Sequence, residues 1–95
     1  MTLIDFNEVM KDDFNDPEFV AAYLEECYND SMETFLMGLG NVAKAHGIAK
    51  TATAAGVNRE NLYRALSAEG NPEIRTIRSV LDVVGMQMKF GPKAA

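Results

Sequence analysis

The side chains best suited to recognising another molecule are gathered in one short stretch in the second half of the chain. Arg59 and Arg64 can bond guanine or phosphate, and Asn61 carries the amide that can pair with adenine. Glu60 and Tyr63 fall on the same side of a predicted helix, because apolar residues occupy its other side. A helix that merely faced solvent would more often carry Glu and Lys four residues apart. The stretch therefore indicates nucleic-acid recognition.

The neighbouring sequence predicts two short helices and a tight turn that position these side chains. Apolar and small residues recur at helical spacing before Gly56, where a left-handed residue ends a helix at little cost. Asn58 is a good N-cap for a second helix, whose inner face carries Leu62 and Leu66. Over about residues 48–67 this is the layout of a helix-turn-helix, whose second helix can enter a DNA major groove. An ordinary helical bundle contains the same inner pattern, so the outward face favours the DNA interpretation.

Charge is unevenly distributed along the 95 residues. The net charge of −5 is unusual for a DNA-binding protein. Residues 1–46 hold ten acidic and two basic residues (net −8), whereas residues 47–95 hold four acidic and seven basic residues (net +3). Phosphates respond to the local positive surface, within a Debye length of about 8–10 Å. The acidic half either keeps the protein soluble or forms a docking surface for a basic protein.

Composition also limits the class of protein. Hydrophobic residues make up 47% of the chain, which argues against disorder. No apolar run approaches the roughly 18 residues that span a bilayer, and the N-terminus lacks the pattern of a secretory signal. A single cysteine, Cys27, cannot form an internal disulfide. We therefore expect a single-domain cytoplasmic protein without a membrane partner.

Few residues offer enzyme chemistry. A nucleophilic site would require Cys27 to meet the single histidine, His46, and no third catalytic group stands out. No His/Cys cluster has the spacing of metal ligands, and neither a P-loop nor a GxGxxG motif is present. The sequence predicts no enzyme, no cofactor and no metal site.

The first half predicts two longer helices behind a leader. The leader, residues 1–15, is either an extended arm or a cover for part of the core. Asp16 and Pro17 then mark a helix start, with an Asp cap and Pro at the first helical position. Asp30 is expected to cap the next helix, which runs to about His46. Gly38 and Gly40 within that helix cost about 1 kcal/mol each, so we expect close approach of another helix there.

The last part of the chain predicts a fifth helix and a strand. Asn71 is expected to cap that helix and Pro72 to begin it. Residues 86–90 alternate apolar and polar side chains, which is typical of a strand. Such a strand must pair with the leader, a second copy or another partner, unless the segment packs flat on the helices. We expect an all-α five-helix bundle with a short C-terminal β-strand, forming a single domain over residues 16–95.

Beyond these patterns, the chain resembles a known family. The sequences GVNRE (residues 56–60), LYRAL (62–66) and GNP (70–72) look like those of the probable addiction-module antidote proteins. The segments YL (23–24) and GNVAKAHG (40–47) also resemble that family. These are small HigA-like antitoxins with a lambda-repressor-like (Cro/C1-type) helix-turn-helix. This chain departs from the pattern at Asn58, where Ser is frequent, and at Thr51, where a larger aliphatic residue is usual.

The resemblance implies a function in two parts. Such antitoxins bind a small basic toxin of the RelE/HigB kind, typically an mRNA-cleaving ribonuclease encoded beside them, and they repress their own promoter. Operator symmetry makes a homodimer the expected state. The implied base-reading residues are Arg59, Glu60 and Arg64; the implied phosphate contacts are Lys50, Asn58 and Tyr63, and Asn61 could serve either role.

The acidic half is the predicted toxin surface, because opposite charges raise association rates and specificity. The residues expected to contribute are Glu18, Glu25, Glu26, Asp30 and Glu33. Two alternatives stay open: a phage-type repressor without a toxin, and a helical interaction module whose DNA motif is vestigial.

Overall fold

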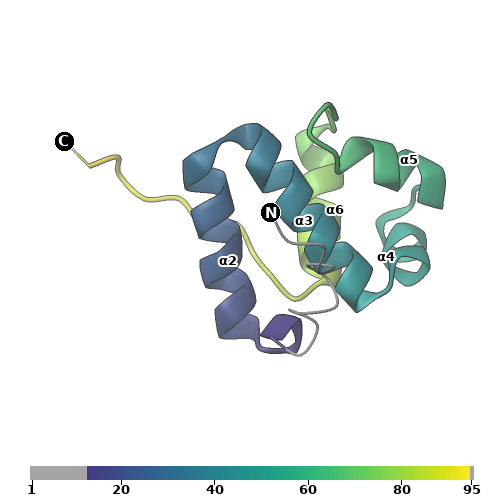
Figure 1. Cartoon of the computed structure of the whole chain (residues 1–95), viewed down its shortest axis with the longest axis horizontal. Helices are drawn as coiled ribbons and strands as arrows, with labels where there is room; N and C mark the ends of the chain where they lie inside the picture. The colour runs from purple at the N-terminus through teal and green to yellow at the C-terminus, as the bar shows by residue number, and fades with distance from the viewer. Residues whose placement is uncertain (1–12, 95) are drawn as a thin grey trace, which may run out of the picture.

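The computed structural model describes residues 13–94, which form a helical fold (Figure 1). A 3-10 turn, η1 (Asp13–Asn15), precedes five α-helices. Their bounds are α2 (Pro17–Asp30), α3 (Met32–His46), α4 (Ile48–Ala55), α5 (Arg59–Ala65) and α6 (Ile74–Val83). Helix α2 packs along α3, and α4 packs against both α3 and α6. The predicted all-α class is confirmed over these residues.

Local capping signals explain most helix ends. Asp16 caps α2 through a 3.0 Å hydrogen bond from the backbone N–H of Glu18 to its carboxylate, and Pro17 is the first helical residue. Gly47 ends α3 with φ 120° and Gly56 ends α4 in the left-handed conformation, φ 77° and ψ 25°. These ends lie where the sequence predicted them.

Two predicted helix starts were wrong. Helix α2 runs through Asp30, so the extended residue Ser31 caps α3 instead, and its Oγ accepts from the N–H of Thr34 at 3.0 Å. Helix α6 begins at Ile74 rather than Pro72, and residues 71–73 are irregular. Capping residues are common in both stretches, and the packing of the buried helix faces decides which of them the helix uses.

One core joins all the helices. The buried apolar side chains are Phe14, Val20, Leu24, Leu36, Leu39, Val42, Ala43, Ala52, Leu62, Leu66, Ile77, Val80 and Leu81. Phe14 belongs to this core and packs its ring 5.1 Å from that of Tyr23. The part of the leader that the structure describes, 13–15, therefore covers the core; the rest of the leader lies outside the described residues.

The two glycines inside α3 lie where other segments approach closely. A Cβ on Gly38 would stand 2.7 Å from Sγ of Cys27 on α2. A Cβ on Gly40 would stand 2.8 Å from the carbonyl oxygen of Leu66, which ends α5. The predicted close approach is thus present, with α2 at Gly38 and with the end of α5 at Gly40.

The C-terminal segment has no regular secondary structure. Residues 86–94 form no strand within the described chain, and Met86 alone among residues 86–90 packs against the core. Phe90 is 93% exposed. A strand needs a second strand to bond its backbone groups, and the described residues of this single chain provide none.

Candidate nucleic-acid interface

Helix α5 is held in place by a cap at one end and by buried leucines on its inner side. The Oδ1 atom of Asn58 accepts a 2.7 Å hydrogen bond from the N–H of Asn61. Leu62 is fully buried and Leu66 nearly so. The cap removes an otherwise unpaired N–H group, and the leucines fix which side of the helix faces the protein.

The opposite side of α5 is open to solvent. The predicted DNA-contacting side chains of this helix are all exposed: Arg59, Glu60, Asn61, Tyr63 and Arg64. Nη1 of Arg64 donates to Oδ1 of Asn61 at 3.3 Å, so these two side chains are already joined. The five together present donors and acceptors on one surface.

The remaining two candidates flank this surface. Lys50 is exposed on α4, and Asn58 is exposed in the turn before α5. Because Oδ1 of Asn58 is bound to the helix, a contact with phosphate would use its Nδ2 amide group.

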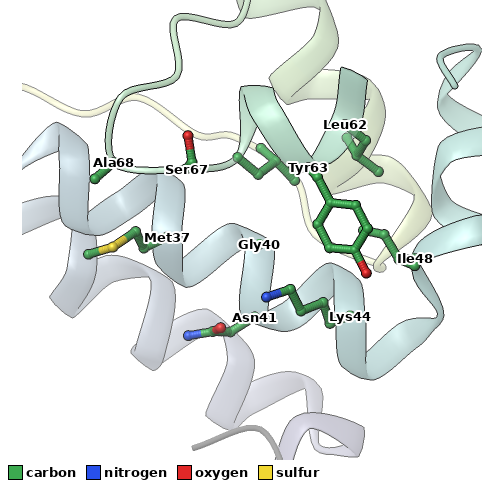
Figure 2. Close-up of a pocket in the computed structure, with 10 residues that line it drawn as sticks. Met37, Gly40, Asn41, Lys44, Ile48, Leu62, Tyr63, Ser67 and Ala68 are labelled. Atoms are coloured by element: carbon green, nitrogen blue, oxygen red, sulfur yellow. The ribbon is translucent and has the colours of Figure 1, made fainter. Parts of the chain in front are cut away.

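A groove runs beside this surface, between α3 and α5 (Figure 2). Its volume is about 370 Å³ and its lining includes Asn41, Lys44 and Tyr63. Lys44 of α3 lies beside Tyr63 in this groove, with its Nζ 5.6 Å from the ring centroid, a cation–π contact. Tyr63 is therefore oriented by the protein while 46% of it stays exposed.

Lys44 is a residue that the sequence did not suggest for this interface. Its position in the last turn of α3 fits a favourable interaction with the helix dipole, and that was its only signal. Only the packing of α3 beside α5 brings its charge next to Tyr63.

The acidic candidates lie elsewhere. Helix α2 is on the left of Figure 1, whereas α4 and α5 are on the right. The structure exposes every predicted toxin-binding residue on α2 or α3: Glu18, Glu25, Glu26, Asp30 and Glu33. Asp30 has a structural role as well, since its Oδ2 accepts a 2.6 Å hydrogen bond from the hydroxyl of Thr34.

Two perturbed groups lie between α2 and α3, away from the exposed side of α5. Burial raises the pKa of Tyr23, although the hydrogen bond from Nδ2 of Asn41 (3.1 Å) partly opposes this. Burial also raises the pKa of the Cys27 thiol. Both groups are therefore neutral near pH 7.

Over residues 13–94, no group of three or more His, Cys, Asp or Glu side chains is placed to hold a metal ion. No helix in the same part of the chain is long and apolar enough to cross a membrane.

Comparison with known proteins decides the class. The model of the probable addiction module antidote protein family matches residues 3–92. The chain belongs to this family. A relative by sequence, described as an uncharacterized protein of Haemophilus influenzae, is 37% identical over 73 residues, 76% of this chain and 75% of that protein. No solved structure matches the chain.

Membership of the antidote family carries a functional consequence. The antidote of an addiction module acts against a toxin, so the family supports a toxin–antitoxin role and implies a toxin partner. The resemblance found in the sequence is confirmed at this level.

Proposed function

We propose that this protein is the antitoxin of a type II toxin–antitoxin module and also represses its own operon. The observation that carries the DNA half is the exposed row of Arg59, Asn61 and Arg64 on a capped, leucine-anchored helix. In this proposal α4 and α5 form the helix-turn-helix of a lambda-repressor-like domain, and α5 enters the major groove.

The side chains have distinct proposed roles. Arg59, Glu60 and Arg64 read base edges, since guanidinium groups pair with guanine and carboxylates accept from cytosine. Lys50, Asn58 and Tyr63 contact phosphates, and Asn61 serves either role. Lys44 adds a positive charge beside Tyr63.

The toxin half rests on the family and on charge. The proposed target is a small basic ribonuclease of the RelE/HigB kind, bound by protein–protein contact through the exposed acidic residues of α2 and α3. Because binding alone neutralises the toxin, no catalytic group, cofactor or metal is required of this chain.

We further propose a cytoplasmic homodimer, because operators with twofold symmetry bind twofold-symmetric proteins. A second copy would also supply a strand partner for residues 86–90, which alternate apolar and polar side chains but form no strand in the described chain.

The first experiment measures binding of the purified protein to the DNA upstream of its gene, across a salt series, with scrambled DNA as control. We expect selective binding that weakens steeply with salt, because phosphate contacts release counterions. Equal affinity for both DNAs, with or without the product of the neighbouring gene, would contradict the repressor half.

A second experiment tests the toxin half. The product of the adjacent gene is assayed for mRNA cleavage with increasing amounts of this protein. Cleavage should cease at a fixed molar ratio. Selective operator binding with undiminished cleavage would instead favour a phage-type repressor without a toxin; failure of both activities would favour an interaction module.

A further inference from the structure

The corner between α2 and α3 exposes two large apolar side chains that are four residues apart in the sequence. Tyr28, in the last turn of α2, is 59% exposed, and Met32, the first residue of α3, is 51% exposed. Neither residue belongs to the core or lines the groove beside α5. Tyrosine and methionine are enriched in protein–protein interfaces, so the corner has the composition of a contact site.

The side chains of this corner contact one another. The ring of Tyr28 meets that of Phe35 edge-on, with centroids 5.7 Å apart and an angle of 89° between the planes. Thr34 makes two hydrogen bonds across the bend: its N–H donates to Oγ of Ser31, and its hydroxyl donates to Oδ2 of Asp30. Side chains already ordered in the free protein lose less entropy when a partner binds.

The charge around the corner selects the partner. The segment 13–43 contains seven Asp or Glu residues and no Lys, Arg or His. Glu25 lies one helical turn before Tyr28, Glu33 follows Met32, and both carboxylates are exposed. A nucleic acid would be repelled, and a second copy would place acidic surface against acidic surface. A protein with a basic surface is the complementary occupant.

We propose that the α2–α3 corner, anchored by Tyr28 and Met32, is the site at which this antitoxin holds its toxin. The partner's matching surface is a shallow apolar recess surrounded by Lys and Arg. This role rests on the proposed antitoxin function. Two kinds of side chain contribute to it in different ways. The carboxylates speed association, whereas Tyr28 and Met32 slow dissociation.

The position of the corner permits both proposed partners to bind together. In Figure 1 the bend between α2 and α3 lies on the side of the molecule away from α4. The exposed side chains of α5 are not part of this corner. A toxin on the corner therefore leaves Arg59 and Arg64 available to DNA.

The test uses the full chain and, as the probe, the purified product of the adjacent gene, immobilised for biolayer interferometry. The double variant Tyr28→Ser/Met32→Ser should dissociate on the order of 30-fold faster, with nearly unchanged association. Tyr28→Phe, which keeps the ring, should behave like the wild type. Ile74→Ser is the matched control, because Ile74 is 67% exposed on α6. Circular dichroism and operator affinity report whether each variant is folded.

The charge variant Glu25→Gln/Glu33→Gln should associate about tenfold more slowly at low salt and lose part of its salt dependence. Wild-type dissociation of a folded Tyr28→Ser/Met32→Ser protein would overturn the assignment of the corner while leaving the antitoxin function intact. Absence of any binding by the wild-type chain would overturn the proposed toxin half, and the corner's role with it.

Discussion

Arg64 and Asn61 are joined on the exposed side of α5 by a hydrogen bond from Nη1 to Oδ1, 3.3 Å long. The two side chains are three residues apart, so they lie one above the other on the helix surface. A hydrogen bond between exposed groups contributes little to stability, but it orders both side chains before a ligand arrives. Replacement of either one therefore affects the position of the other.

We expect Arg64→Ala to weaken operator binding by about 1–3 kcal/mol and to relax the preference at one base pair. The variant lacks the guanidinium group that we propose contacts a base. Affinities for a panel of single-base operator variants provide the measurement. Arg75→Ala is the matched control, since it removes the same charge from an exposed site on α6. A uniform loss on every sequence would show that Arg64 contacts phosphate instead.

The cap of α5 should be measurable as stability. Asn58→Ala removes the oxygen that accepts from Asn61 N–H and should cost about 1 kcal/mol in the free energy of unfolding. Asn58→Ser retains a capping oxygen and should lose only a small part of this. Urea denaturation distinguishes the two variants, and equal stabilities of the Ala and Ser proteins would contradict the role of the cap.

The contact between α2 and α3 predicts an unfavourable glycine replacement. Gly38→Ala should destabilise the protein by about 1–3 kcal/mol, although alanine is the better helix former, because its Cβ would meet Sγ of Cys27 at 2.7 Å. In a Cys27→Ala background the same replacement should cost less, because the contact with Sγ is gone and only the 3.2 Å contact with Cβ of residue 27 remains. The measurement is a double-mutant cycle by urea unfolding. A cost that is the same in both backgrounds would rule out the clash as its cause.

The buried Cys27 and the partly buried Tyr23 predict the direction of pH dependence. Burial raises the pKa of Cys27 above its ordinary 9.0 and that of Tyr23 above its ordinary 10.0. A raised pKa in the folded state means that folding favours the protonated forms of Cys27 and Tyr23. The free energy of unfolding is therefore highest below about pH 9, and it falls as the pH rises through the pKa values of the folded state. The urea midpoint should therefore fall above about pH 9, and less steeply in Cys27→Ala. A midpoint that rose in that range would disprove the sign.

Features that depend on neighbouring residues could be predicted from the sequence. The cap at Asp16, the left-handed Gly56 and the cap at Asn58 each follow from local backbone chemistry. The start of α6 could not, because Asn71, Pro72 and the true cap Glu73 lie in one irregular stretch. Helix packing, which acts over long range, makes that choice.

The environments of Thr51 and Lys44 depend on helix packing and could not be predicted from the neighbouring sequence. Thr51, a departure from the usual aliphatic residue, is fully buried, and its hydroxyl donates to the carbonyl oxygen of Gly47 at 2.8 Å. This hydrogen bond pairs the buried hydroxyl group, so Thr51 fits in the apolar core. Lys44 lies next to the exposed side of α5 only because α3 packs beside α5, and it contacts Tyr63, 19 positions later in the sequence.

The alternation of apolar and polar residues over 86–90 predicts a strand, but the described residues of the single chain offer no second strand to pair with it.

The helices on opposite sides of Figure 1 carry opposite net charges. Helix α2 carries four carboxylates and no Lys or Arg, whereas α4 and α5 together carry three Lys or Arg residues and one carboxylate. A polyanion would therefore attract α4 and α5 and repel α2. In the DNA complex that we propose, α5 is expected to approach the phosphates first. The corner at Tyr28, our proposed toxin site, would then remain open to a second protein.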